Sequence, residues 1–262
     1  MNSTILEVFR GGPADPVQLP LFGSPLPAIA ITFLYLLLVL KVGPDFMECR
    51  KPYNVRTAML IYNLCQVFMN AALFIKGTEY LFVRKAYNFR CMHMLPLDHP
   101  EKNADRMFTY FFFLNKVVDL VDTVFFVLRK SNKQITVLHV YHHGLMTLGV
   151  PIVYYFYGPG GQYNTMGYLN SFVHVVMYSY YFVAAGYPQV KKTFWWKQYI
   201  TKLQILQFAI LFAQAFLTMW LNPGCTFPRP LQFMQIAVSA SMMVMFGNFY
   251  YQTYLKAKSK KQ

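Results

Sequence analysis

Three histidines, His139, His142 and His143, stand at positions i, i+3 and i+4 of the sequence. On an α-helix these positions share one face, so the three imidazoles would project in the same direction. A fourth histidine, His174, follows in the next apolar stretch. Imidazole can bind a metal, transfer a proton or attack an acyl group, so these four side chains are the first candidates for a reactive site.

Charged residues precede the histidines with the same periodicity. Lys116, Asp119 and Asp122 are spaced by three, with Thr123 adjacent, and would share one helix face. Three further stretches carry polar side chains at helical spacing: Asn63, Gln66 and Asn70; Asn170, His174, Met177, Tyr178 and Tyr181; and Thr201, Gln204, Gln207 and Gln214. In lipid such stripes must face one another. Asn and Gln are typical of contacts between membrane helices, whereas the histidines beside a Lys/Asp cluster indicate function.

Three kinds of chemistry could use the histidines. A di-iron desaturase or hydroxylase would need about eight histidines, and the chain has six. A single zinc could be held by three, but His139 and His143 have no carboxylate between them that would act as a base. The third option is attack of an imidazole on an acyl thioester, which requires no metal. We therefore predict no metal site, and a metal-dependent lipid oxygenase or a transporter with a polar core stays as the alternative.

The composition is that of a membrane protein. Hydrophobic residues make up 56% of the 262 positions and charged residues only 13%, against about 25% charged in soluble domains. Residues 134–190 contain no Asp, Glu, Lys or Arg, which leaves room for two spans of about 20 residues each. A Gly-Pro-Gly-Gly sequence at 158–161 divides them.

The same test along the chain predicts an all-α integral membrane protein with seven transmembrane helices. The predicted spans are residues 26–42, 57–76, 107–128, 135–156, 165–185, 201–221 and 231–253, followed by a tail at 254–262. One long polar connection lies at about 77–106. We expect a single membrane domain over 1–262, with neither a soluble appendage nor a cleavable signal peptide.

The distribution of Lys and Arg predicts the orientation. With seven spans, the side that holds the C-terminus receives fifteen of these residues and the other side eight. Because basic loops stay cytosolic, we expect a cytosolic C-terminus and a lumenal N-terminus, where Asn2 would be a glycosylation site. In the tail, Lys258 and Lys260 resemble a dilysine retrieval signal of endoplasmic reticulum membrane proteins.

The net charge of +14 does not indicate nucleic-acid binding. The basic residues cluster at the predicted membrane edges and are not interleaved with an exposed aromatic surface. They are explained by anchoring of cytosolic loops. A basic cytosolic rim would also attract an anionic soluble substrate.

Four segments together resemble a known family. KVVDLVDT at 116–123, HVYHH at 139–143, NSFVHVVMYSYY at 170–181 and TKLQILQF at 201–208 are similar, in order and spacing, to the signature segments of the very-long-chain fatty acid elongases. The resemblance extends over nearly the whole chain. One departure is Asp119, where the family usually has Glu, so the charge is kept on a shorter side chain.

The resemblance implies a reaction that composition alone does not indicate. Such an enzyme, a 3-oxoacyl-CoA synthase, condenses a long-chain acyl-CoA with malonyl-CoA, releases carbon dioxide and CoA, and needs no further cofactor. It also implies that the last six spans form a barrel around a narrow acyl tunnel that opens to the cytosol. Expected partners are the bilayer, the reductases and dehydratase of the elongation cycle, and a homo- or hetero-oligomer.

The resemblance further suggests roles for the polar residues. His142 would attack the acyl thioester, and His174 would position or stabilise the thioester and enolate oxygens. His139 and His143 would support His142. The Lys116, Asp119 and Asp122 cluster would either set the electrostatics of the enolate or hold the helices together. The residues expected to bind substrate are Asn170, Tyr178, Tyr181, Thr201, Gln204 and Gln207.

Two cysteines, Cys91 and Cys225, fall in loops assigned to the lumen, where an oxidising environment permits a disulfide. Similar elongases also suggest this pairing. The bridge would tie the long connection to the loop before the last span.

Overall fold

The computed structural model describes residues 12–17, 19–187, 189 and 194–256, with the side chains of Phe194 and Trp195 left out. Asn2, Lys258 and Lys260, predicted as a glycosylation site and a retrieval signal, lie outside the described residues. Throughout the described ranges the regular structure is helical, without a β-strand. Each of the seven predicted ranges contains a helical segment, although residues 135–136 precede α7 and Leu120 interrupts the third range.

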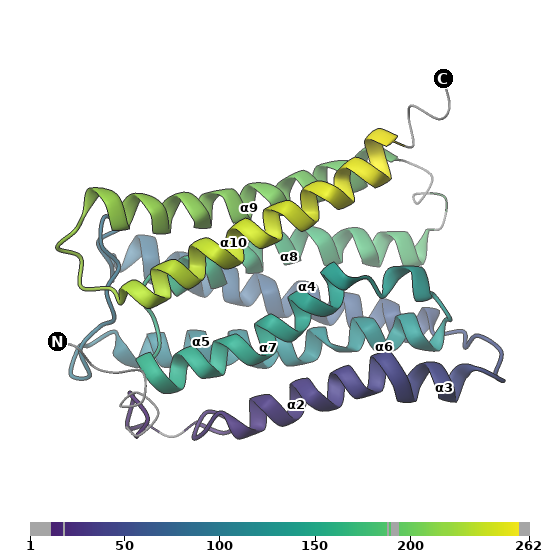
Figure 1. The fold of residues 1–262 in the computed structure, drawn as a ribbon, viewed down its shortest axis with the longest axis horizontal. Coiled ribbons are helices and arrows are strands. Elements are labelled where there is room, and N and C mark those ends of the chain that lie inside the picture. The colour runs from purple at the N-terminus through teal and green to yellow at the C-terminus, as the bar shows by residue number, and fades with distance from the viewer. Residues whose placement is uncertain (1–11, 18, 188, 190–193, 257–262) are drawn as a thin grey trace. The chain divides into compact units, whose positions relative to one another are not determined.

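The helices differ from the predicted ranges mainly at their ends (Figure 1). The first segment comprises α2 (Leu26–Leu37), a π-helical turn (Leu38–Val42) and α3 (Gly43–Met47). The second is α4 (Arg56–Thr78) with a π-helical turn (Glu79–Val83), and the third is α5 (Lys102–Asp119) followed by α6 (Val121–Leu128). After a 3₁₀ turn (Asn132–Gln134) come α7 (Val137–Tyr157), α8 (Tyr163–Gly186), α9 (Phe194–Leu221), α10 (Arg229–Tyr250) and a π-helical turn (Tyr251–Leu255).

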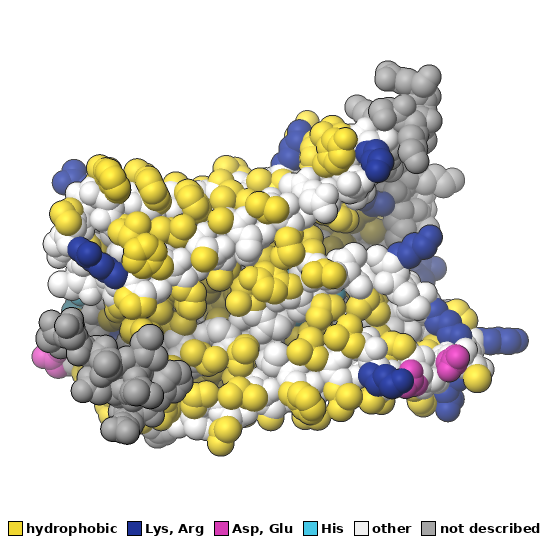
Figure 2. All heavy atoms as spheres, viewed as in Figure 1, with side chains coloured by type: hydrophobic (Ala, Val, Ile, Leu, Met, Phe, Trp, Pro, Cys, Tyr) yellow, Lys and Arg dark blue, Asp and Glu magenta, His cyan; other side chains and the backbone are white. Residues whose placement is uncertain are grey.

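Four described segments are long and apolar enough to cross a membrane: Leu26–Met47, Arg56–Val83, Trp196–Leu221 and Arg229–Leu255. Their outward side chains are largely apolar, as Figure 2 shows along α2 and α10, with Lys and Arg gathered near helix ends. On α2, Leu26 is 71% exposed and Phe33 63%. Such exposure suits a lipid environment and not water. The segments that carry the histidines and the Lys/Asp cluster are less apolar because of these same polar side chains.

The chain divides into two compact units. The first, Met1–Val55 with Met94–Gly160, contains α2, α3, α5, α6 and α7; α7 packs against both α2 and α5, and α3 packs against α6. The second, Arg56–His93 with Gly161–Gln262, contains α4, α8, α9 and α10; α4 packs along α8, which contacts α9, and α9 packs along α10.

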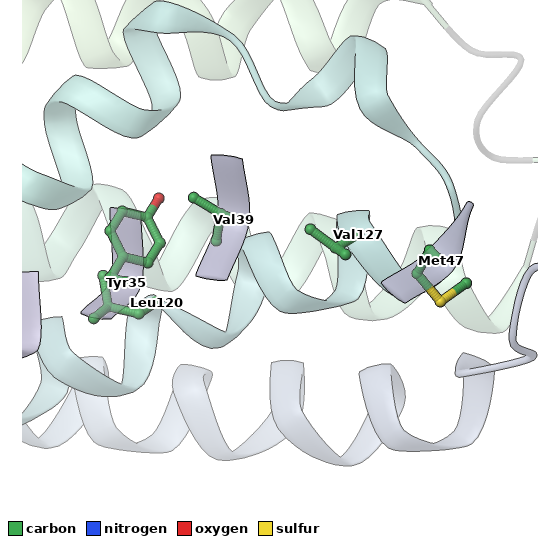
Figure 3. Close-up of a cluster of buried hydrophobic side chains, with 5 residues drawn as sticks. All are labelled: Tyr35, Val39, Met47, Leu120 and Val127. Carbon is green, nitrogen blue, oxygen red and sulfur yellow. The ribbon is translucent and has the colours of Figure 1, made fainter. Parts of the chain in front are cut away.

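An apolar cluster holds the first unit together around α2, the π-helical turn that follows it, α3, α6 and Leu120 at the start of α6. It consists of Tyr35, Val39, Met47, Leu120 and Val127 (Figure 3). The contact of α3 with α6 depends on a glycine. A Cβ added at Gly43 would lie 2.8 Å from Cγ1 of Val127, so a larger residue would push the two helices apart.

At the other end of α5 and α7, buried charges fix the segment that precedes α2. Arg106 donates to both oxygens of Asp15 at 3.0 and 2.9 Å, and the Asp15 side chain is fully buried. Lys102 is also buried, and its ammonium donates to the carbonyl of Pro159 at 3.4 Å. Burial lowers the pKa of Lys102, while the carboxylates of Asp105 and Asp15 oppose that shift.

A disulfide between Cys91 and Cys225 lies in the second unit. The two Cα atoms are 5.5 Å apart, and 134 positions separate the cysteines in the sequence. The bridge connects the loop after α4 with the loop between α9 and α10. Nearby, Asn222 donates to the carbonyl of Arg90 at 3.1 Å, so both loops are joined by a second contact.

Candidate active site

The three clustered histidines occupy the first two turns of α7. Thr136 begins this helix as its N-cap, and its side-chain oxygen accepts a hydrogen bond from the backbone N–H of His139 at 3.2 Å. The ring centroids of His139 and His143 are 4.3 Å apart, and those of His142 and His143 are 5.7 Å apart. His143 is buried, and the other two are half-buried. The structure therefore brings the three rings together, as their spacing predicts.

The Lys/Asp cluster lies where α5 ends and α6 begins. Lys116 donates to Asp119 Oδ2 at 2.7 Å, and each of the two side chains is only 2% exposed. Both residues belong to the last turn of α5, so this ion pair joins no two helices. Asp122, half-buried, lies in the first turn of α6.

The helix is interrupted between the two aspartates. Leu120 donates its N–H to Val117 O, and Thr123 donates its N–H to Leu120 O, both at 3.2 Å. These are i to i+3 bonds, tighter than those of an α-helix, and such a turn inside a helix is often found at functional positions. The sequence gives no proline or glycine here that would predict the break.

Tyr35 joins this site although sequence reasoning did not select it. Its hydroxyl lies 3.0 Å from Thr123 Oγ1, which in turn lies 2.8 Å from His139 Nε2. Tyr35 is 4% exposed and Thr123 is fully buried. A tyrosine within an apolar run gives no signal of such a role, because its partner is 88 positions away.

Arg129 is a second residue of the site that the sequence indicated only as an anchoring charge. Its guanidinium carbon lies 5.8 Å from the ring centroid of Phe126, and that ring is 5.1 Å from the ring of His139. One of its nitrogens donates to Gln134 Oε1 at 3.1 Å, while the buried Nε has no hydrogen-bond partner among the described residues. Burial lowers the pKa of Arg129, although a guanidinium stays charged.

The second unit contains the other intramembrane histidine. His174 on α8 is 5% exposed, and its ring centroid is 5.5 Å from that of Tyr178. The Tyr178 hydroxyl is 3.4 Å from the hydroxyl of Tyr62 on α4, which accepts a hydrogen bond from Gln66 at 3.2 Å. Asn70 in turn donates to the carbonyl of Gln66 at 2.8 Å. The polar stripes of α4 and α8 therefore face each other.

The remaining predicted substrate-binding residues also belong to this unit. Asn170 and Gln207 are buried, whereas Tyr181, 6.0 Å from Tyr178 between ring centroids, is 38% exposed. Gln204 on α9 donates to the sulfur of Met177 at 3.7 Å.

Thr201, also on α9, donates to the carbonyl of Lys197 in its own helix at 3.1 Å and lies 3.5 Å from the hydroxyl of Tyr254. Within the described residues, no group of three or more His, Cys, Asp or Glu side chains is arranged to hold a metal ion.

These features define a helical membrane protein with a buried ion pair and clustered histidines in one unit and a histidine–tyrosine network in the other. The model of the GNS1/SUR4 family, ELO, matches residues 20–262. The chain therefore belongs to this family, that of the very-long-chain fatty acid elongases.

Individual relatives are similar over most of the chain. Very long chain fatty acid elongase F of Drosophila simulans is 41% identical over 254 residues, which cover 95% of this chain and 96% of the relative. The elongase F of Drosophila melanogaster is 41% identical over 252 residues, covering 95% and 98%. Human very long chain fatty acid elongase 4 is 36% identical over 249 residues, covering 92% and 76%.

Proposed function

We propose that the chain is the condensing enzyme of fatty acid elongation, a 3-oxoacyl-CoA synthase. It would join a long-chain acyl-CoA to malonyl-CoA with loss of carbon dioxide, giving a 3-oxoacyl-CoA two carbons longer. The observation that carries this proposal is the cluster of three histidine rings beside the buried Lys116–Asp119 pair, in a member of the elongase family. Imidazole is a nucleophile that keeps an acyl group activated after the first CoA leaves.

The reaction proceeds in two half-reactions. An imidazole nitrogen of His142 attacks the thioester carbonyl carbon, the carbon–sulfur bond breaks, and the CoA thiolate leaves with the proton lost from the imidazole. Malonyl-CoA then loses carbon dioxide, and the electron pair of the broken carbon–carbon bond forms an enolate. The enolate carbon attacks the acyl-imidazole carbonyl carbon, and the carbon–nitrogen bond to His142 breaks as the 3-oxoacyl-CoA forms. The departing imidazole nitrogen takes up a proton from solvent, which restores neutral His142.

Neighbouring groups support these steps. The ring centroid of His143 is 4.3 Å from that of His139 and 5.7 Å from that of His142, so His143 would hold the nucleophile in place. As the resemblance to the family implies, His174 would stabilise the thioester and enolate oxygens. Because the Lys116–Asp119 pair is internal to α5, an electrostatic role at the active site is better supported than a role in joining helices. A fixed cation near developing negative charge lowers the barrier to its formation.

The substrates divide between two environments. The acyl chain would lie in a narrow tunnel among the last six of seven spans, as the resemblance to the family implies, because an apolar chain is stabilised by leaving water. Asn170, Tyr178, Tyr181, Thr201, Gln204 and Gln207 would line or close this path. CoA carries several phosphates and would bind the basic cytosolic rim, where the unsatisfied Nε of Arg129 can donate to a phosphate oxygen.

The same proposal includes a location and partners. The single membrane domain would reside in the endoplasmic reticulum, with its N-terminus lumenal and the tail at 254–262 cytosolic. There it would pass its 3-oxoacyl-CoA product to a reductase, then to a dehydratase and a second reductase. No metal or organic cofactor is required by this chemistry.

Purified enzyme in lipid nanodiscs, supplied with labelled malonyl-CoA and a panel of acyl-CoAs, tests the proposal. We expect labelled 3-oxoacyl-CoA to accumulate together with an equal amount of carbon dioxide, and no product from the His142→Ala variant. Oxygen consumption with an unlabelled, desaturated product would assign the chain to the metal-dependent oxygenases. Movement of solute without any new covalent bond would assign it to the transporters.

A further inference from the structure

A chain of two hydrogen bonds links the first helical segment to the histidine cluster. It runs from the hydroxyl of Tyr35 on α2 to Thr123 Oγ1 on α6, at 3.0 Å, and from there to His139 Nε2 on α7, at 2.8 Å. All three residues belong to the first unit. Neither Tyr35 nor Thr123 is exposed enough to exchange these partners for water, since their exposed fractions are 4% and 0%.

The donor and acceptor of each of these two hydrogen bonds can be assigned by elimination. Among the described residues, Thr123 is the one hydrogen-bond partner of the Tyr35 hydroxyl. A buried hydroxyl proton requires an acceptor, so Tyr35 donates to Thr123 Oγ1. The proton of Thr123 then points to His139 Nε2, which must accept it as an unprotonated nitrogen. His139 is thereby a neutral imidazole with its proton on Nδ1.

The opposite direction leaves a group unsatisfied. If His139 donated from Nε2, Thr123 would donate to Tyr35, and the buried Tyr35 proton would have no acceptor in the described part of the chain. Native structures rarely leave a buried hydroxyl without an acceptor. The two arrangements therefore predict different tautomers of one histidine.

We propose that Tyr35 and Thr123 are positioning residues of the elongase active site, which fix His139 as the neutral Nδ1–H tautomer. The inference rests on the proposed function for its catalytic consequence, but the tautomer itself does not depend on that function. With Nε2 already occupied, His139 is neither the acyl acceptor nor a base through this nitrogen. Its ring instead forms a rigid support for His143, 4.3 Å away, and through it for His142.

The proposal gives the first segment a part in catalysis. By composition this segment is a plain membrane anchor, and the resemblance places only the last six spans around the substrate. Tyr35 connects α2 to the reactive cluster through Thr123 and also packs within the apolar cluster of this unit (Figure 3).

Three variants of the full chain, purified in nanodiscs, test it. Thr123→Val keeps the shape and removes the hydroxyl, Thr123→Ser keeps the hydroxyl, and Tyr35→Phe removes the first donor alone. We expect Thr123→Val to lower kcat about tenfold, the cost of one lost hydrogen bond, with an unchanged KM for acyl-CoA. Tyr35→Phe should have a smaller effect, because Thr123 can still donate, and Thr123→Ser should retain most of kcat. Tyr155→Phe is the matched control and should retain full activity, because Tyr155 lies on α7 but outside the hydrogen-bond chain of Tyr35, Thr123 and His139.

Nitrogen NMR of histidine-labelled enzyme gives a readout that packing alone would not change. Comparison with a His139→Gln variant identifies the His139 signals. In the unmodified enzyme and in Thr123→Ser, we expect a protonated Nδ1 and an unprotonated Nε2, and in Thr123→Val a mixture of both tautomers.

A protonated Nε2 in the unmodified enzyme would overturn the proposal, as would a Thr123→Ser variant as impaired as Thr123→Val. The spectra report the tautomer of His139 even if the enzyme makes no 3-oxoacyl-CoA. In that case the proposed function fails, but the role of Tyr35 and Thr123 in fixing the tautomer is still tested. If Thr123→Val does not fold, the kcat and the spectrum of Tyr35→Phe test the proposal instead. An unaltered kcat in Tyr35→Phe would contradict the positioning role of Tyr35.

Discussion

Replacing Asp119 with Asn would remove the carboxylate that lies 2.7 Å from the Lys116 ammonium in a site where both side chains are 2% exposed. At this separation the attraction is about 6 kcal/mol with an effective dielectric constant of about 20. Much of it offsets the desolvation of the two charges, and removal of one partner from a buried pair costs about 3–5 kcal/mol. For a chain of this size, where 1 kcal/mol corresponds to about 2–4 °C, we therefore expect Asp119→Asn to lower the unfolding temperature by roughly 6–20 °C.

The exposed pair Lys41–Asp45 provides the control. It has i, i+4 spacing and an N–O distance of 3.0 Å, but its side chains are 72% and 57% exposed. Solvent screens such a pair, so Asp45→Asn should leave the unfolding temperature within experimental error. Unfolding of nanodisc-embedded protein, followed by intrinsic fluorescence, measures both variants.

A double variant separates stability from catalysis. Lys116→Met with Asp119→Leu removes both charges and should recover most of the lost stability, because no buried charge is left behind. If Lys116 stabilises the enolate, this folded variant should still lose about a hundredfold in kcat. A double variant with full activity would refute the electrostatic role, and an Asp119→Asn variant as stable as the unmodified enzyme would refute the reasoning about burial.

Three further results are expected. A Cβ at Gly43 would lie 2.6 Å from a backbone oxygen, so Gly43→Ala should lower the free energy of unfolding by about 1–3 kcal/mol. Gly149 lies in open space on α7, so Gly149→Ala should not lower it. Equal effects of the two substitutions would contradict this reasoning. Peptide mapping without reductant should recover Cys91 and Cys225 joined, and their replacement by Ser should cost about 2–4 kcal/mol; free thiols in unreduced protein would contradict it. Arg129→Gln should raise the KM for acyl-CoA roughly tenfold with little change in kcat. Arg129→Lys keeps the charge, so its KM should lie between those of Arg129→Gln and the unmodified enzyme. An unchanged KM in Arg129→Gln would exclude this residue from the CoA site.

The sequence predicted the helical segments because the charge-free runs and the polar stripes are both local patterns. The spacing of His139, His142 and His143 likewise predicts a shared face, and the ring contacts on α7 agree with it. The bounds were less accurate, since α9 extends to Phe194 and helical turns continue α4 to Val83. The extension of α9 contains Lys197 and Gln198 among its aromatic residues, and that of α4 contains Glu79 and ends in a π-helical turn, so neither belongs to an uninterrupted apolar run.

Other features depend on contacts between distant positions and could not be read from local patterns. Tyr35 looks like one more apolar residue of α2 until the fold places it beside Thr123. Arg129 counts as one of many basic residues in the sequence, and only the fold shows its Nε buried near Phe126. The break at Leu120 has no proline or glycine to announce it.

The release of CoA from acyl-CoA in the absence of malonyl-CoA tests the central claim most directly. If His142 is the covalent acyl carrier, the unmodified enzyme should release about one equivalent of CoA per active site in a rapid burst, and the acyl group should be recovered on a peptide containing His142. His142→Ala should give no burst, whereas His143→Ala would retain a slower one. An undiminished burst in His142→Ala would move the nucleophile elsewhere, and the absence of any burst in the unmodified enzyme would contradict the covalent mechanism in favour of a ternary complex of both thioesters.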